Sequence, residues 1–215
     1  MTMHAECFRR EPDAAVCVVD WRRRLPTLVG NRVTLREVDA ADASALLASL
    51  GTEAVSRHLS RPPSSSEGFQ RFIAWAQAER RQGTHACFAV VPAGEPAPVG
   101  IVQVWRIESD FFTAEWGIAI GDAWWGRGIG HDAAHLLLRF AIDTLGTRRL
   151  EARAGTHNER GRQLMLRLGA AHEGTLRRSL RCNGHVRDQD LWAIVVDDDE
   201  REGRWAQARG AAAEY

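Results

Sequence analysis

The sequence predicts an α/β fold in which helices flank one mixed central sheet of about seven strands. Strand-like and helix-like patterns follow one another in the order β-α-α-βββ-α-β-α-ββ, which is typical of this class. A glycine-rich loop joins the end of the three-strand meander to a helix pattern. The chain has 215 residues, of which 45% are hydrophobic, so it is long enough to bury the core of one domain.

The first half of the chain begins with an alternating strand pattern over Arg32–Arg36. Asp39 is expected to cap a helix that ends near Leu50, because a short acidic side chain accepts hydrogen bonds from a first helical turn. Pro62-Pro63 and the serines after them interrupt the chain and start a second helix, which ends near Arg81.

The meander and the second half of the chain complete the sheet. Gly, Pro and Asp turn signals separate the meander strands, and Gly169 ends the last helix. The expected elements are strands over 86–91, 99–106 and 114–120, a helix over 128–144, a strand over 150–154, a helix over 158–168, and strands near 171–178 and 189–196.

Composition excludes several classes of function. The formal net charge is +0 and the sequence pI is about 7.1, which gives no electrostatic reason to expect nucleic acid or an anionic membrane as partner. No apolar run approaches a membrane span, and the polar segment 1–12 does not resemble a signal peptide. The four cysteines, Cys7, Cys17, Cys87 and Cys182, form no Cys-x-x-Cys pair, so we expect reduced thiols, no zinc site and a cytoplasmic location.

The segment Trp124–Gly130 is the most informative motif. It lies between a strand-like run that ends at Ile120 and a helix-like run from His131. Three glycines at a helix start leave backbone N–H groups free, and the helix dipole favours an anion such as a pyrophosphate. The alternative is an ordinary glycine-rich turn that binds nothing, since the spacing matches neither the Walker nor the Rossmann pattern.

This motif resembles the pyrophosphate-binding motif of the GNAT acyltransferase superfamily, and its Trp-Gly-Arg-Gly-Ile-Gly form is most similar to the RimJ/RimL branch. Residues 158–170 resemble the second signature of that branch, and 173–177 with 183–188 resemble the third. The resemblance runs from about Leu28 to Val196. It implies a GNAT domain over 28–196, an N-terminal extension over 1–27 and a C-terminal tail over 197–215.

The resemblance implies an acetyl-CoA-dependent N-acetyltransferase, with acetyl-CoA as cosubstrate and a primary amine that attacks it directly in a ternary complex. The acceptor would be a protein N-terminus or a small amine. The oligomeric state is left open, and a homodimer is one possibility. A rival interpretation is a non-catalytic, CoA-binding or regulatory module. Its motivation is Gly161 and Met165, which stand where relatives carry the Ser or Tyr hydroxyl proposed to protonate the thiolate.

Each predicted site residue has a plainer structural alternative. Glu115 is the candidate base for the acceptor amine, or a strand carboxylate paired with an arginine. The resemblance implies that Asn158 contacts the pantetheine arm, and the alternative is that it only caps its helix. The remaining predicted cofactor residues are the backbone of Ile118, Ala119 and Ile120 for the pantetheine amides, and Trp125, Gly126, Arg127, Gly128, Ile129 and Gly130 for the pyrophosphate.

His131 and His135 share one helix face, with the spacing of a His-Glu-x-x-His zinc site. No further ligand is evident downstream, and a pyrophosphate explains the helix start better. The sequence therefore predicts no metal.

Overall fold

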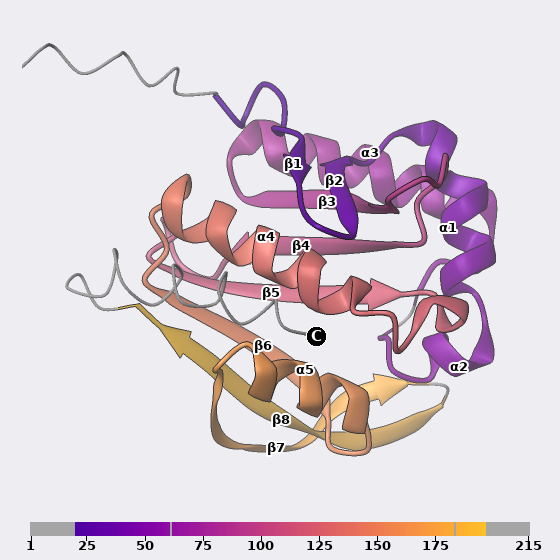
Figure 1. Ribbon diagram of the computed structural model, residues 1–215. Coiled ribbons are helices and arrows are strands. Elements are labelled where there is room, and N and C mark those ends of the chain that lie inside the picture. Colours follow the sequence, from indigo (N-terminus) through magenta and orange to yellow (C-terminus); the bar gives the residue numbers. More distant parts are fainter. Residues whose placement is uncertain (1–19, 61, 183, 197–215) are drawn as a thin grey trace, which may run out of the picture.

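The computed structural model describes residues 20–60, 62–182 and 184–196 (Figure 1). The expectations for the rest, including a short strand over 16–19, Cys7, Cys17 and the acidic and Ala-rich tail, lie outside the described residues. Eight strands form one sheet in the order β1-β2-β3-β4-β5-β6-β8-β7. They are β1 Leu28–Val29, β2 Val33–Glu37, β3 His85–Pro92, β4 Gly100–Arg106, β5 Thr113–Ile120, β6 Arg149–Gly155, β7 Ala171–Cys182 and β8 His185–Val195.

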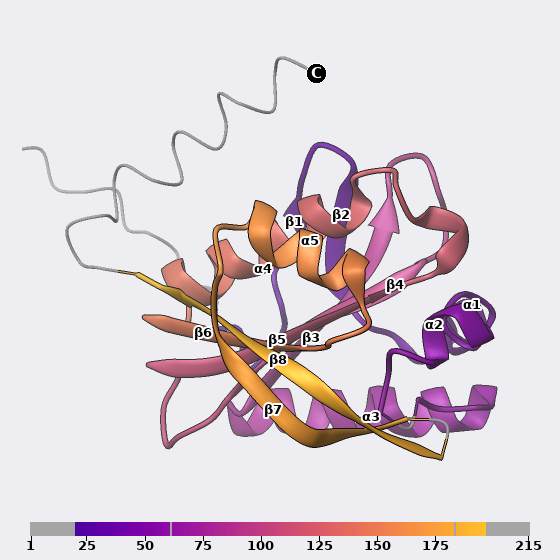
Figure 2. The ribbon, with the colours of Figure 1, turned by 90° about the horizontal axis from the view of Figure 1, so that it is seen from below.

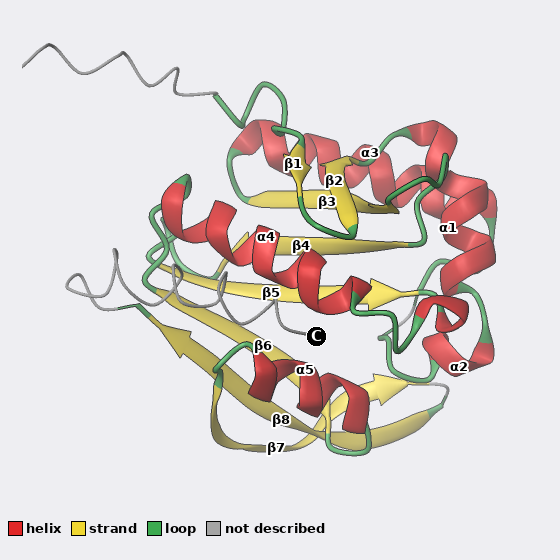
Figure 3. Ribbon diagram, in the orientation of Figure 1, coloured by secondary structure: helices red, strands yellow, loops and turns green. Residues whose placement is uncertain are grey.

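The helices cover both faces of this sheet (Figures 2 and 3). α4 and α5 lie on one face, and α3 lies on the other. The helices are α1 Ala43–Leu50, α2 Glu53–Ser56, α3 Ser66–Gln82, α4 Ile129–Asp143 and α5 Glu159–Arg167, with short 3-10 turns at Ala40–Asp42 and Asp122–Trp124. None of these described helices combines the length and the apolarity needed to cross a membrane.

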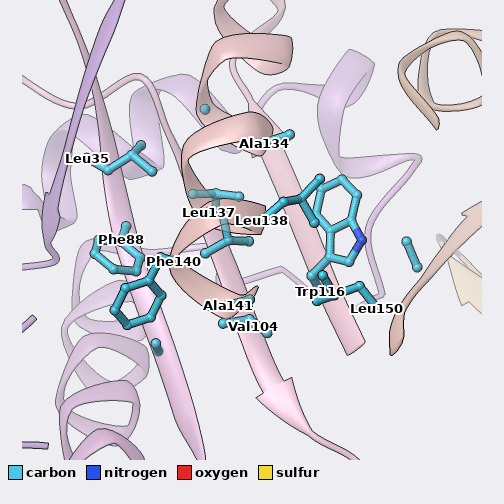
Figure 4. Close-up of a cluster of buried hydrophobic side chains, with 14 of the residues drawn as sticks. Leu35, Phe88, Val104, Trp116, Ala134, Leu137, Leu138, Phe140, Ala141 and Leu150 are labelled. Atoms are coloured by element: carbon cyan, nitrogen blue, oxygen red, sulfur yellow. The ribbon is translucent and has the colours of Figure 1, made fainter. Parts of the chain in front are cut away.

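The larger hydrophobic core lies between α4 and the sheet (Figure 4). Alternate residues of a strand face one side, so β3, β4 and β5 present Phe88, Val104 and Trp116 to α4. The apolar face of α4 packs on them through Ala134, Leu137, Leu138, Phe140 and Ala141. A second core on the opposite face packs α1 and α3 against Cys87, Ala89, Ile101 and Ala119. Residues one step apart on a strand therefore serve different cores.

Local signals mark the helix starts, although Asp39 caps the 3-10 turn Ala40–Asp42 that leads into α1 and not α1 itself. Asp39 accepts a hydrogen bond from Ala41 N and forms a capping box with Asp42. Ser65 caps α3, and Gly83 ends it in the left-handed conformation at φ 73°. The predicted fold class is confirmed.

The structure departs from the sequence predictions at three places. β1 is an eighth strand of only two residues, too short to show an alternating pattern. α2 is a single turn that begins after Thr52, whose side chain accepts from Val55 N. β7 and β8 are longer than predicted, since β7 ends at Cys182 and β8 begins at His185, with Gly184 between them at φ 76°. The Asn-Gly pair there is a hairpin signal that the sequence prediction did not use.

Candidate active site

β5 and β6 form a wedge at the centre of the sheet. They pair in parallel through only three residues each, Thr113–Glu115 with Arg149–Glu151. Beyond that point β5 continues to Ile120 and β6 to Gly155, and the two strands diverge (Figure 1). β4 pairs with the other edge of β5 up to Ile120. Among the described strands, the edge of β5 that faces β6 is therefore unpaired beyond Glu115.

Backbone alternation decides which amides face this wedge. Thr113 O accepts from Ile107 N at 3.1 Å, and Gly121 N donates to Val99 O at 2.9 Å, so both groups point to the β4 side. Groups two residues apart point the same way, which directs the peptide groups of Ile118 and Ile120 into the wedge and that of Ala119 toward β4. Ile118 thus presents a free backbone N–H and carbonyl to the wedge, whereas Ile120 presents only its N–H, because its carbonyl accepts from Trp125 Nε1.

A cavity of about 370 Å³ occupies this wedge. It brings together every predicted cofactor residue except Arg127, and Glu115 is not among its lining residues. The lining consists of Val55, His58, Leu59, Ile118, Ala119, Ile120, Trp124, Trp125, Gly126, Gly128, Ile129, Gly130, His131, Asn158, Glu159, Arg160, Gly161, Gln163, Leu164 and Arg167.

The glycine-rich loop forms one end of the cavity. Gly126 and Gly128 have φ angles of 77° and 75°, a left-handed conformation that favours glycine. Gly128 is the N-cap of α4, and no side chain caps the helix. The first-turn amides therefore point outward with the positive end of the helix dipole, as an anion site requires.

Two arginines lie at this helix end. The Arg127 guanidinium lies 4.9 Å from the centre of the Trp124 ring. Arg32 Nε comes within 3.1 Å of the place where a Cβ on Gly128 would lie, and His131 in the first turn of α4 lines the cavity. Asp132 is turned away from the cavity, because its carboxylate accepts from the backbone N–H groups of Arg32 and Val33 at 2.7 and 3.1 Å. The loop and its surroundings are thus suited to a polyanion.

Asn158 combines both of its predicted roles. Its Oδ1 accepts from Gly161 N at 3.0 Å, so it caps α5, and the residue also lines the cavity. Its Nδ2 makes no hydrogen bond with another described residue, which leaves two N–H donors for a ligand.

Two neighbouring aromatic and cationic contacts were not predicted. Trp125 Nε1 donates to Ile120 O at 2.8 Å and so fixes the loop to the end of β5. The Arg160 guanidinium lies 4.5 Å from the centre of the Trp125 ring, which links α5 to the loop across the cavity. Sequence reasoning had no signal for this contact, because residues 125 and 160 meet only in the folded chain.

Glu115 lies at the vertex of the wedge, on the sheet face opposite α4. Its side chain is 16% exposed and its Oε2 lies 3.6 Å from Arg153 Nη2. Burial raises the pKa of the Glu115 carboxyl above its ordinary value, Arg153 opposes this shift, and the nearby Glu151 adds to it. The arginine pairing is confirmed, and a half-buried carboxylate of raised pKa is also a better base than an exposed one.

The cavity wall offers few groups that could give a proton to a thiolate. No Ser, Thr, Tyr or Cys occurs among its described lining residues. Met165 is only 5% exposed and packs in the core. His58, which the sequence did not single out, lines the cavity and stacks on His157 with ring centres 5.2 Å apart. Burial and neighbouring cations lower the pKa of His58, so it is neutral at pH 7.

Among residues 20–60, 62–182 and 184–196, no group of three His, Cys, Asp or Glu side chains is placed to hold a metal ion.

Comparison with known proteins identifies the class. A family model described as "Acetyltransferase (GNAT) domain" matches residues 32–171, and the chain belongs to this family of acetyl-CoA-dependent acyltransferases. The chain is 27% identical over 132 residues to the [Ribosomal protein uS5]-alanine N-acetyltransferase of Escherichia coli. The aligned region covers 61% of this chain and 68% of that protein.

Solved structures share the fold. Mycobacterium smegmatis RimJ in complex with CoA-disulfide superposes with a TM-score of 0.78 at 22% identity, covering 90% of this chain and 96% of that one. RimL, a ribosomal L7/L12 α-N-protein acetyltransferase in complex with coenzyme A, gives a TM-score of 0.72 at 18% identity, covering 80% and 99%. Both belong to the RimJ/RimL-like group that the sequence motifs resemble.

Proposed function

We propose that this protein transfers the acetyl group of acetyl-CoA to a primary amine, a protein N-terminus or a small amine, by direct attack in a ternary complex. The observation that carries the proposal is the cavity, which joins the strand edge at Ile118 and the free N–H of Ile120 to the start of α4, where no side chain caps the helix. CoA has amides in its pantetheine arm and a pyrophosphate beyond it, so its groups match those of the cavity in order.

The matched groups define how CoA binds. The pantetheine amides pair with the N–H and carbonyl of Ile118 and with the N–H of Ile120, as an added strand does, and Asn158 Nδ2 donates to the same arm. The pyrophosphate accepts from the first amides of α4. This arrangement directs the thioester along β5 toward the vertex where Glu115 lies. Bound in this way, the thioester and an amine beside Glu115 would meet as neighbours, and proximity alone lowers the barrier by about 7 to 11 kcal/mol.

The reaction must remove two protons from an ammonium group. Glu115 takes the first proton and passes it to water, which leaves a neutral amine. The amine nitrogen then attacks the thioester carbonyl, the C–N bond forms, the C–S bond breaks, and the second nitrogen proton is lost as the thiolate gains one. Direct attack is supported by the lining residues, which include no Ser or Cys to act as a nucleophile.

A protein N-terminus is supported by the relatives, two of which are named as N-acetyltransferases of ribosomal proteins. The proposed domain extends over 28–196, because β1 begins at Leu28 and β8 ends at Val195, on either side of the matched residues 32–171.

The test is thioester consumption with amine-bearing peptides and small amines, compared in two matched variants. Glu115→Gln should lower kcat/KM by about 10- to 1000-fold while the affinity for acetyl-CoA stays unchanged. Glu151→Gln is the control, because Glu151 is the strand partner of Glu115, is also 16% exposed and also pairs with an arginine. Equal rates in the two variants would make Glu115 structural.

The second candidate is a non-catalytic CoA-binding module. The absence of a hydroxyl or thiol from the described lining of the cavity favours it. Calorimetric binding of acetyl-CoA without thioester consumption in the presence of any amine would support the module and refute the transferase.

A further inference from the structure

An aromatic strip leads across the sheet face opposite α4 toward Glu115. Trp75 of α3 lies 5.0 Å from His85 of β3, ring centre to ring centre, and His85 lies 6.2 Å from Trp105 of β4. Phe72 extends the strip along α3, at 5.8 Å from Trp75. Trp75 is 49% exposed, so the strip is open to solvent at the helix.

The strip ends against the candidate base. Trp105 and Glu115 are direct partners in the antiparallel register of β4 and β5, so both side chains leave the same face of the sheet. The Trp105 indole also reaches across β5. Its atoms Cη2 and Cζ3 lie 3.6 and 3.8 Å from the place of a Cβ on Gly117, and apart from the chain neighbours of Gly117 no other atom of the described residues lies within 4 Å of that place. Beside Glu115, the edge of the Trp105 indole therefore lies over the backbone of Gly117, which has no side chain.

The charges around this corner favour one ammonium group and an apolar neighbour. Burial lowers the pKa of His85 to about 4, so the ring is neutral at pH 7 and the whole strip is uncharged. The Glu115 carboxylate attracts an ammonium group, and an aromatic ring next to it adds a cation–π attraction. On the other side of Glu115, the Glu151 carboxylate is paired with Arg149 at 2.9 Å, and Arg153, whose side chain is 42% exposed, would repel a second cation.

We propose that Phe72, Trp75 and Trp105 form the acceptor-recognition strip, supported from below by His85, which is only 3% exposed and contacts both tryptophans, and that the acceptor is a peptide α-amino group whose first side chain is apolar or aromatic. This inference rests on the proposed transferase function. The ammonium group binds between Glu115 and Trp105, and the first side chain lies on the strip toward Trp75. Polyamines fit poorly because of Arg153, and amino sugars fit poorly because the strip offers their hydroxyl groups few partners.

The test uses four pentapeptides that differ only in the first residue: phenylalanine, leucine, alanine or lysine. Their affinity for the CoA-loaded protein is measured by calorimetry, and kcat/KM with acetyl-CoA is measured separately. The phenylalanine and leucine peptides should bind about tenfold more tightly than the alanine peptide, and the lysine peptide most weakly. Trp105→Ala should abolish this preference, and Trp105→Phe should keep most of it.

Phe112→Ala serves as the matched control, because Phe112 is also an exposed aromatic residue, at 60%, and lies on the loop before β5. It should leave the preference unchanged. Equal affinities for the four peptides, or an undiminished preference in folded Trp105→Ala protein, would overturn the inference.

Two further outcomes separate this inference from the proposed function. Faster acetylation of a polyamine than of any peptide would overturn the acceptor class and leave acetyl transfer standing. Peptide binding with the predicted preference but without thioester consumption would support the strip and refute the transferase.

Discussion

Replacing Gly126 with alanine isolates the contribution of the glycine-rich loop to CoA binding. Gly126 has a φ of 77°, and apart from its two chain neighbours no atom of the described residues lies within 4 Å of the place of a Cβ on it. An added methyl group would therefore stand in open space at the wall of the cavity. Gly94, on the turn between β3 and β4, has a φ of 83° and equally open surroundings, but it does not line the cavity.

Gly126→Ala and Gly94→Ala should lose the same stability, but only Gly126→Ala should lose affinity for acetyl-CoA. A left-handed conformation costs an L-residue about 1 to 2 kcal/mol, so each thermal midpoint should fall by about 2 to 8 °C. In Gly126→Ala alone, the methyl group also keeps the pyrophosphate from the backbone. Losing one hydrogen bond to a charged group costs about 1.5 to 3 kcal/mol, which raises the Kd for acetyl-CoA about 10- to 150-fold.

Calorimetric titration with acetyl-CoA, paired with thermal unfolding of both variants, measures the two effects separately. Gly94→Ala should bind acetyl-CoA as the parent does. If Gly126→Ala shows the same thermal shift as Gly94→Ala and also the parental Kd, the loop does not hold the pyrophosphate and the reasoning from its glycines fails.

Three further predictions concern single side chains. Because burial raises the pKa of Glu115, its ionised form costs stability once the pH is above that pKa, so Glu115→Gln should raise the thermal midpoint at pH 7 and change it little at pH 4. A Cβ on Gly161 would lie 2.8 Å from Asn158 Nδ2, so Gly161→Ser and Gly161→Ala should both disturb the cap of α5, and their kcat values should agree. A kcat more than tenfold higher in the serine variant would show that thiolate protonation limits the rate, since tenfold is about 1.4 kcal/mol of barrier. Asp132→Ala removes the acceptor of two backbone N–H groups and should lower the free energy of unfolding by about 2 to 4 kcal/mol in urea titration, whereas unchanged stability would mean that water replaces the carboxylate.

The sequence predicted most of the fold because its signals are local. Asp39, Ser65 and Asn158 cap helices through bonds to residues two or three positions away, so the pattern is visible in a short window. Gly128 starts α4 without a side-chain cap, but the glycine-rich motif around it is also visible in a short window. The two-residue strand β1 and the single turn α2 gave no such window, and both were missed.

The cavity was predicted in part. The loop and the end of β5 are close in sequence, and Trp125 Nε1 bonds to Ile120 O only five residues away. His58 reaches the same cavity from the turn after α2, and Arg160 reaches it from α5. No pattern near His58 indicates a ligand, and the motif that contains Arg160 did not indicate its contact with Trp125, because both positions depend on how distant segments pack.

By itself, the sequence determined the order of the elements, their caps and a helix start with free amides, since each follows from near neighbours along the chain. Only the tertiary structure decided that β5 and β6 separate after three paired residues, and that divergence opens the cavity. Likewise, only strand register set Trp105 beside Glu115 and Glu115 within 3.6 Å of Arg153. The physical reason is that register comes from the packing of both sheet faces at once, a balance of many distant contacts that no short stretch of sequence contains.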